Sequence, residues 1–453
     1  MLAAAAKPFV NLVEKYLPDP FVFVLALTIV VMGAAVIMQQ QPVTQVLEYW
    51  GEGFWSLLTF SMQMLLVLVS GHMLASTVIM KNALNTIARL AASPGKAIVL
   101  VTLVSMLASW LNWGFGLVVG ALFAKAIARR IEVDYRLLVA SAYSGFVVWH
   151  GGLAGSVPLT IATPGHFAED LIGVVNTSDT LFSPLNMTLL AILFVIMPVV
   201  NRAMMPPEAE RVYVEAKHLK EPEPPTPSGH ISPAEKLERN PILALLAGLA
   251  GVAYLCLHFT KGGTLNLNII NFVFLFLAII LHGTPERLLH SMQQAIQGAS
   301  GIVLQFPFYA GIMAIMVQSG LARELSQWLI SAATADTLAL YSFLSAGIVN
   351  MLIPSGGGQW AVQAPVVLPA ALELGADVSK VSMAVAWGDA WTNLIQPFWA
   401  LPVLAIAGVK SQRYHGLLSC TADHHGYHHQ RSSNDIITRL SASHRFKGFT
   451  GHS

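Results

Sequence analysis

The sequence predicts an all-α polytopic membrane protein, an inverted repeat with two re-entrant hairpins and two discontinuous helices. Of its 453 residues, 55% are hydrophobic and only 11% are charged, whereas a soluble chain carries roughly 25% charged residues. The charges gather between long apolar stretches, and several of these stretches are interrupted by glycine, proline and polar residues. This composition excludes a soluble enzyme and a disordered protein, and a net charge of +1 excludes a nucleic-acid binder.

The first helix is expected over Pro20–Met38, which has no charged residue and is about as long as the ~20 residues that cross a bilayer. A cleavable signal peptide is the alternative, but no small-residue cleavage site clearly follows the stretch. The second helix is expected over Phe54–Ile79. Basic residues precede the first helix and follow the second, and the loop between them has none. By the positive-inside rule, the N-terminus is cytoplasmic.

A re-entrant hairpin is expected over Ala97–Ala128. The segment Ser109–Gly116 divides this region into two arms that are too short to cross the bilayer, and basic residues flank both of its ends. The tip of the hairpin would then lie near the middle of the membrane. The alternative is one tilted helix with a kink at its glycines.

A discontinuous crossing is expected next. Its first half is Leu137–Trp149, and its break is His150–Pro158, where glycines and a proline exclude a regular helix. An acidic loop follows, as an extracytoplasmic loop can be, and Leu185–Val200 returns to the cytoplasm. This completes the first membrane repeat, 1–200. Residues 201–240 combine charges of both signs with a proline cluster and are expected to form a cytoplasmic linker.

The second half, 241–409, repeats this order after one additional crossing. That crossing makes the second copy enter the membrane from the opposite side, so the repeats are inverted, which is the construction of secondary transporters. Its elements are expected, in order, over Pro241–Phe259, Leu265–Leu281 and Gln294–Val317 (helices), Leu338–Leu374 with a break at Pro354–Trp360 (hairpin), and Val378–Val409 with a break at Trp387–Pro397 (discontinuous crossing).

The repeat requires a further helix after Val409, but residues 410–453 are polar and rich in histidine. A one-nucleotide shift converts His-His encoded CAT CAT into Ile-Ile, and with suitable synonymous codons it converts Arg413–His429 into the apolar sequence DIMGYCLAPLIITGIII. We therefore interpret 410–453 as an aberrant tail produced by a frameshift, a hypothesis that the gene sequence can test. The alternative is a histidine-rich metal-binding tail.

The breaks supply the candidate substrate site. A helix interrupted inside lipid leaves backbone groups that cost several kcal/mol each unless something binds them, and helix N-termini suit a small anion such as a carboxylate. Neither tip has an Arg or Lys for a bidentate clamp, which favours a monocarboxylate. The candidate substrate-binding residues are Asn112, Gly114 and Gly116 at the first tip, Ser355, Gly356, Gly357 and Gln359 at the second, and Asn393 and Gln396 in the second break.

Tryptophans also cluster at the breaks, where they wall an apolar pocket for an acyl chain or simply pack. They are Trp110, Trp113, Trp149, Trp360, Trp387 and Trp391.

Asp389 is the one carboxylate inside an expected discontinuous crossing. An ionised Asp at the centre of a membrane helix costs about 3 kcal/mol on insertion scales. As a coupling group it would bind H⁺ or Na⁺, and the alternative is an N-cap of the following half-helix. His150 can titrate near neutral pH, or it is a structural residue. Apart from H⁺ or Na⁺, no cofactor and no metal ligand set is expected.

Six motifs follow one another over residues 10 to 410: Leu17–Pro20, Trp50–Trp55, Asn112–Gly120, Val303–Gly311, Pro354–Gly358 and Gln396–Pro402. They resemble the bacterial short-chain fatty acid transporter family. The resemblance implies an inner-membrane carrier for acids such as acetoacetate or butyrate, distantly similar to the ion-transporter superfamily with its paired re-entrant hairpins. The family normally ends in a hydrophobic helix, from which residues 410–453 depart.

These features favour a cation-coupled secondary transporter of short-chain monocarboxylates and not an enzyme. Its expected partners are the carboxylate and the bilayer, with no nucleic acid, and the sequence is compatible with a homo-oligomer without fixing one. A carrier of another small organic anion is the alternative. An intramembrane hydrolase is a more distant one, for which Ser156 near His150 is the local candidate nucleophile.

Overall fold

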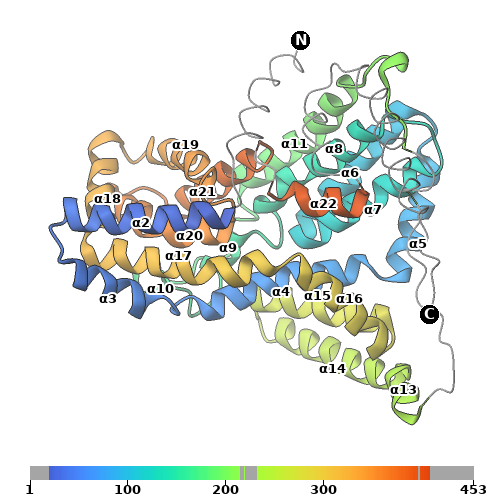
Figure 1. The fold of residues 1–453 in the computed structure, drawn as a ribbon, viewed down its shortest axis with the longest axis horizontal. Helices are drawn as coiled ribbons and strands as arrows, with labels where there is room; N and C mark the ends of the chain where they lie inside the picture. Colours follow the sequence, from blue (N-terminus) through green and yellow to red (C-terminus); the bar gives the residue numbers. More distant parts are fainter. Residues whose placement is uncertain (1–19, 215–218, 220–231, 396–397, 409–453) are drawn as a thin grey trace, which may run out of the picture.

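The computed structural model describes residues 20–214, 219, 232–395 and 398–408, and each regular element within them is a helix. The first hairpin and its neighbours (cyan) and the second hairpin (orange) lie at opposite ends of the molecule, with α9 between them (Figure 1). The tail 410–453 and Gln396 lie outside the described residues.

The first half begins with a helix whose bounds the sequence predicts, Pro20–Met38. The second expected helix, Phe54–Ile79, is divided, because the Thr77 side chain accepts a hydrogen bond from Met80 N and starts a new helix there. The elements are α2 (Pro20–Met38), α3 (Val43–Gly53), α4 (Leu58–Ala75), α5 (Val78–Ile87), η1 (Ala88–Leu90), α6 (Pro94–Leu111), α7 (Trp113–Ala128), α8 (Tyr135–Ser144), η2 (Gly145–Gly151), α9 (Ser156–Ile161), α10 (Glu169–Ile172) and α11 (Pro184–Ala203).

In the second half, the expected helix Gln294–Val317 is also divided, and an amphipathic helix precedes the apolar one. The elements are η3 (Glu208–Glu210), α13 (Pro233–Glu238), α14 (Pro241–Thr260), α15 (Leu267–His282), α16 (Pro285–Gln297), α17 (Ser300–Ser319), α18 (Leu321–Ala332), α19 (Leu338–Asn350), α20 (Gly356–Leu374), α21 (Val378–Thr392) and α22 (Ala400–Ala407). The second break therefore begins at Asn393, later in the chain than the expected Trp387, because α21 continues through Thr392.

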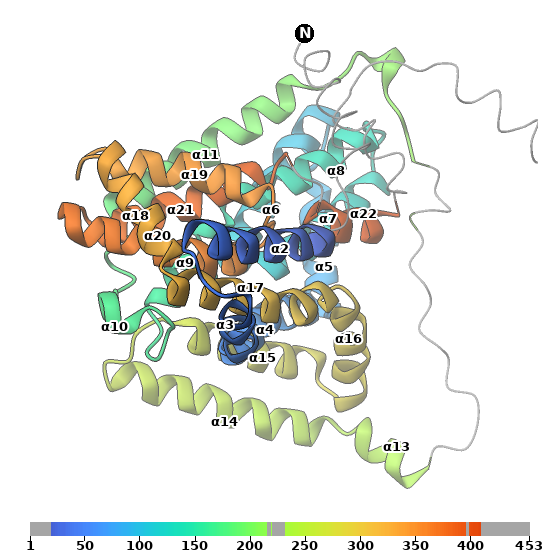
Figure 2. The ribbon, with the colours of Figure 1, turned by 60° about the vertical axis from the view of Figure 1, so that its left-hand side comes forward.

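Seven helices of the described residues are long and apolar enough to cross a membrane. One of them, α14, lies along the outside of the molecule (Figure 2) and exposes Leu245, Leu246 and Leu249 by 52–60%. Apolar side chains are exposed in this way where lipid replaces water as the solvent. The chain is a multi-pass membrane protein.

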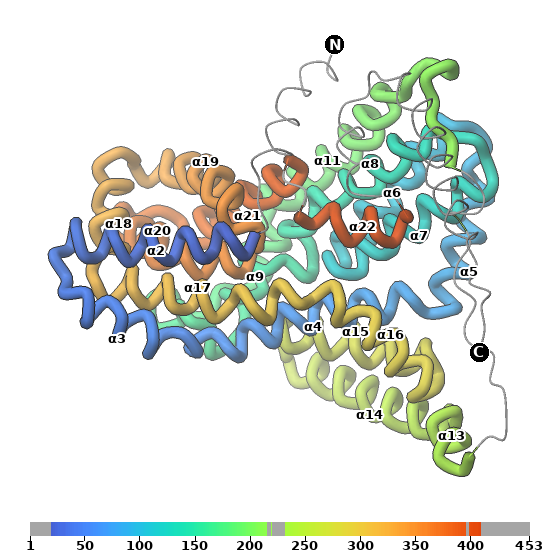
Figure 3. The backbone as a smooth tube through the Cα atoms, viewed as in Figure 1, coloured from blue at the N-terminus to red at the C-terminus, as the bar shows by residue number. Residues whose placement is uncertain are grey.

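Each discontinuous helix joins two separate hydrophobic cores. Leu137 and Leu138 of α8 pack in the core around α7, whereas Val157 and Ile161 beyond the break pack in the core around α20 and α21. In the other discontinuous helix, Val381 and Val385 of α21 pack in the core around α20, whereas Ala390 at the end of α21 and the following α22 pack in the core around α7. The two breaks therefore lie where the chain passes from one core to the other, between the hairpins (Figure 3).

Candidate functional site

The first interrupted segment is a hairpin and not a kinked helix. A Cβ added to Gly116 would lie 2.2 Å from Ser109 Oγ, and one added to Gly120 would lie 2.9 Å from Ser105 Oγ. As the chain moves away from the tip along α7, from Gly116 to Gly120, the facing residue in α6 changes from Ser109 to Ser105, so the two helices are antiparallel. At the tip, Asn112 Oδ1 accepts from Phe115 N at 2.9 Å, which caps α7.

The second tip is a helix N-terminus in a crowded surrounding. Ser355 caps α20, and the three glycines after it each face a different neighbour. A Cβ on Gly356 would lie 2.5 Å from the His150 ring, one on Gly357 would lie 3.1 Å from Phe60, and one on Gly358 would lie 2.4 Å from Tyr309. Only a residue without Cβ lets the backbone approach all three.

The break of the first discontinuous helix lies between the two tips. On one side, Leu153 N donates to Trp110 O at 2.7 Å, which ties the break to the end of α6. On the other side, Trp149 and His150 contact Gly356 of the second tip. We call this region the hairpin junction; the tip residues Asn112 and Gly356 and the break residues Trp149 and His150 are all buried in it.

His150 is fully buried, and its ring has a defined tautomer. Nδ1 lies 2.7 Å from Ala386 O, and a carbonyl oxygen only accepts, so Nδ1 carries the proton. Nε2 is then an acceptor, and it is buried without a hydrogen-bond partner. The hydrolase alternative has no support here, because Nε2 faces Gly356 and the described residues show no hydrogen bond between His150 and Ser156.

Asp389 lies inside the continuous helix α21, so it does not cap the half-helix after the break. Its Oδ2 accepts from Asn350 Nδ2 at 2.5 Å, and its Oδ1 accepts from Asn393 Nδ2 at 2.7 Å. His150 Nδ1 lies 3.4 Å from Oδ1. The carboxyl group thus joins three elements: the second hairpin, the first break and the start of the second break.

Three tryptophans at the junction carry buried indole N–H groups without a partner. The ring centroid of Trp113 lies 5.9 Å from the ring centroid of Trp149 and 5.0 Å from that of Trp399. In each of the three, Nε1 is buried and has no hydrogen-bond partner in the structure. The sequence indicates Trp113 and Trp149 as pocket walls or packing residues and does not single out Trp399, because a local pattern does not tell which indole N–H lacks an acceptor.

The remaining candidates serve packing as well as the junction. A Cβ on Gly114 would lie 2.7 Å from Leu68 Cα, so this glycine lets α7 approach α4. Gln359 donates to Ala346 O at 2.9 Å and to Gln363 Oε1 at 3.0 Å, and its own Oε1 is buried without a partner. Asn393 holds Asp389, as described above.

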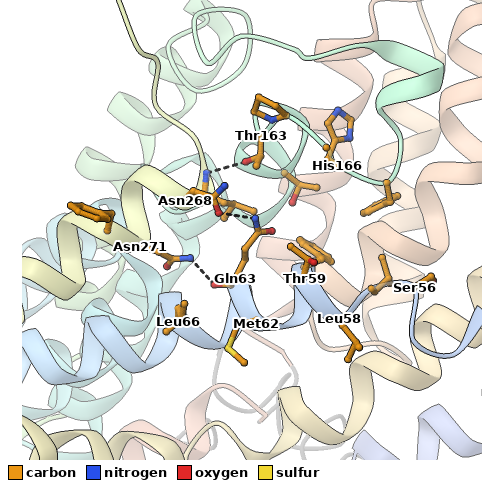
Figure 4. Close-up of a pocket in the computed structure, with 18 of the residues that line it drawn as sticks. Ser56, Leu58, Thr59, Met62, Gln63, Leu66, Thr163, His166, Asn268 and Asn271 are labelled. Atoms are coloured by element: carbon orange, nitrogen blue, oxygen red, sulfur yellow. Dashed lines mark hydrogen bonds between the residues drawn. The ribbon is translucent and has the colours of Figure 1, made fainter. Parts of the chain in front are cut away.

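A cavity of about 860 Å³ lies beside the junction, between α4, the loop after α9 and the start of α15 (Figure 4). Phe60 lines it and also contacts Gly357 at the second tip. This cavity was not predicted from the sequence.

Comparisons with known proteins agree with this architecture. The family model for short-chain fatty acid transporters matches residues 1–421. A protein of Escherichia coli strain K12, assigned to short-chain fatty acid transport by name, is 42% identical over 414 residues, which are 90% of this chain and 94% of that protein. A Haemophilus influenzae protein of the same name is 41% identical over 421 residues, again 90% and 94%.

Among solved structures, the YdaH transporter of Alcanivorax borkumensis, described as having an unusual topology, superposes with a TM-score of 0.58. It is 17% identical, and the match covers 89% of this chain and 94% of that one. At this identity the likeness supports the fold alone.

Proposed function

Because the chain belongs to the short-chain fatty acid transporter family, we propose that it carries short-chain monocarboxylates such as acetoacetate or butyrate across the cytoplasmic membrane, coupled to a cation. The carboxylate binds at the hairpin junction. The cation and the substrate then cross together as the two hairpins shift relative to the breaks.

The observation that carries this proposal is the set of unpartnered donors at the junction. Trp113, Trp149 and Trp399 each bury an indole N–H without an acceptor, and an unpaired buried donor costs about 1–3 kcal/mol. A carboxylate is an acceptor with room for several such bonds. The N-terminus of α20 adds backbone N–H groups and a partial positive charge. The rings around the donors give the acyl chain an apolar wall.

Coupling is proposed at Asp389, a carboxyl group that is 1% exposed. The described groups next to its oxygens are the neutral amides of Asn350 and Asn393 and the His150 ring, whose Nδ1 lies 3.4 Å from Oδ1. An ionised carboxylate that far from water is costly, so it favours the binding of a cation, H⁺ or Na⁺. Because its partners come from three elements, cation binding and the relative position of the hairpins depend on each other.

Uptake of radiolabelled butyrate and acetoacetate into proteoliposomes tests the function. We expect accumulation above equilibrium when a pH or Na⁺ gradient is imposed, and equilibration when it is collapsed. Uptake that never exceeds equilibrium under either gradient would remove cation coupling, and the absence of saturable uptake of both acids would remove the substrate assignment.

A further inference from the structure

The cavity beside the junction has a mixed lining with no charged carboxylate, ammonium or guanidinium group among the described residues that form it. Gln63, Asn268 and Asn271 supply polar groups, and Leu66, Phe272 and Leu275 supply apolar surface (Figure 4). Its volume of about 860 Å³ lies within the ~300–1,000 Å³ range of ligand pockets. A four-carbon acid would occupy only part of that volume.

The one titratable group in the lining, His166, is neutral. Its Nδ1 accepts from Ala168 N at 3.3 Å, and its Nε2 therefore carries the proton and donates to Gly173 O at 3.0 Å. Burial lowers the pKa of the His166 imidazole, which holds the ring in this form at neutral pH. A carboxylate entering the cavity would lose water without gaining a counter-charge.

Asn271 presents an acceptor that lacks a donor. Its Nδ2 donates to Gln63 O at 2.9 Å, and this bond fixes the orientation of the amide, because the reversed amide would place two oxygens together. Its Oδ1 is buried without a hydrogen-bond partner, and Asn271 as a whole is 6% exposed. The group that satisfies this oxygen is an O–H or N–H donor, not an anion.

Phe60 is the wall between the cavity and the second hairpin tip. Its ring centroid lies 5.7 Å from those of Phe167 and Phe306, and a Cβ on Gly357 would lie 3.1 Å from its Cζ. A rotation of this one ring about χ1 changes the barrier between the cavity and the junction. The charge pattern predicts that α4 and α15 begin on the extracytoplasmic side, where the loop after α9 also lies.

We propose that this cavity is an antechamber that binds the short-chain acid in its uncharged, protonated form and passes it to the hairpin junction past Phe60. At the junction the acid releases its proton to the Asp389 carboxylate and binds as a carboxylate. The carboxylic O–H donates to Asn271 Oδ1, and the aliphatic chain lies on the apolar lining. The identity of the ligand rests on the proposed function, whereas the preference for an uncharged donor rests on the cavity alone.

Saturation-transfer NMR on the purified full chain tests the antechamber with butyramide as the probe. Butyramide has the length of butyric acid, stays uncharged at every pH and keeps a donor at the position of the acid O–H. We expect a binding signal for butyramide at pH 7.5. Butyrate at the same pH is ionised and should not displace it from the cavity, whereas lowering the pH should make butyrate an increasingly effective competitor.

Two variants remove the site in different ways. Asn271→Leu removes the acceptor, and Thr59→Trp fills the cavity from an exposed position that holds no described hydrogen bond. Asn271→Leu should reduce the butyramide signal about fivefold, the loss expected of one hydrogen bond of about 1 kcal/mol. Thr59→Trp should reduce it at least as much, because the added ring occupies the space of the ligand. Ser178→Trp, which adds the same ring at an exposed loop position outside the cavity, should leave it unchanged.

An undiminished butyramide signal in Thr59→Trp overturns the antechamber. Displacement of butyramide by butyrate that is equally effective at pH 5.5 and pH 7.5 overturns the preference for the uncharged form. The NMR experiment measures the binding of butyramide and not transport, so it still tests the antechamber if the proteoliposomes transport neither acid. Failure of the antechamber and failure of the proposed function are therefore separate results.

Discussion

At the scale of the residue, the junction combines groups whose hydrogen-bonding capacity is used with groups whose capacity is not. Both polar atoms of the Asn112 side chain have a partner, since Oδ1 caps α7 and Nδ2 donates to Val67 O at 3.3 Å. His150 Nε2 and the indole N–H groups of Trp113 and Trp149 are not used. Buried polar groups without partners are uncommon in folded proteins, so these are the positions at which a ligand or a moving element is expected to supply one.

The Asp389→Asn variant is expected to separate coupling from binding. It keeps the size of the side chain and removes its charge and titration, so gradient-driven accumulation of butyrate should be lost while exchange of labelled for unlabelled butyrate continues. In the same proteoliposomes, counterflow measures the exchange and gradient-driven uptake measures the accumulation. Asp377→Asn is the matched control: Asp377 caps the same helix by accepting from Ser379 N at 2.8 Å, and Asn caps as well as Asp. Accumulation that survives in Asp389→Asn contradicts the coupling role.

The Trp149→Phe variant tests the indole donors. It keeps the stacked ring and removes the N–H group, so the KM for butyrate uptake should rise by about tenfold, the equivalent of one hydrogen bond to a charged group of about 1.5 kcal/mol. Trp50→Phe is the control, because Trp50, on α3, also buries an unpartnered Nε1 but lies away from the junction, against Phe54 just after α3 and Phe308 on α17. Equal changes of KM in both variants would mean that the N–H group at the junction does not bind substrate.

At the scale of the element, the glycines at the start of α20 set the distance between the second hairpin and its neighbours. Each of the three would bring a Cβ to 3.1 Å or less from a packed side chain. Of these side chains, the His150 ring is the most constrained, since it is bonded to Ala386 O and stacked on Trp149 at 3.6 Å. The helix N-terminus reaches the break only because no side chain separates them.

Gly356→Ala should therefore lower stability and transport together. The added methyl would lie 2.5 Å from the His150 ring, and overpacking of this kind typically costs about 1–3 kcal/mol. Thermal unfolding of the purified protein should show a lower Tm. Gly33→Ala, at a helix position where nothing lies within 4 Å of the added Cβ, should leave the Tm unchanged or raise it slightly, because alanine favours helix by about 0.5–1 kcal/mol over glycine. A Gly356→Ala protein with an unchanged Tm would contradict the packing argument.

At the scale of the whole molecule, the two discontinuous helices connect two cores, one that holds the first hairpin and one around α20 and α21, although Ala361 and Val362 of α20 pack in the first. A break costs backbone hydrogen bonds, and here the chain replaces some of them: Asn186 Nδ2 donates to Gly151 O at 3.0 Å, and Leu153 N donates to Trp110 O. A crossing that is divided between two cores lets those cores move relative to each other without unwinding a continuous helix. This is the motion that alternating access requires.

The orientation of the whole molecule is predicted from charge alone and can be tested by labelling. In a background with Cys256→Ser and Cys420→Ser, Ser178→Cys should react with a membrane-impermeant maleimide in intact cells, because its loop is expected outside. Lys236→Cys in the linker should react only after the cells are permeabilised. Both positions are exposed in the structure. Labelling of position 236 in intact cells would reverse the orientation.

The sequence by itself determined the all-helical membrane class, the bounds of the first helix and the existence of both hairpins. These depend on apolar runs, glycines and capping residues that act over a few positions, which is why Pro20–Met38 and the Asn112 tip lie where the pattern predicts. It placed the first break too late, because α8 ends at Ser144 and the 3-10 helix η2 follows, and it placed the second break too early, because α21 continues through Gly388. A Cβ on Gly388 would lie 2.3 Å from Phe343 O, so that glycine serves helix packing and not a break.

Only the tertiary structure decided which tip meets which break. The contacts of Gly356 with His150, of Asp389 with Asn350 and of Phe60 with Gly357 join residues that are far apart in the chain. The physical reason is that a local pattern fixes how a segment folds, while the partner of a buried donor or acceptor depends on how the separate cores dock. The unpartnered indoles and the uncharged cavity are properties of that docking.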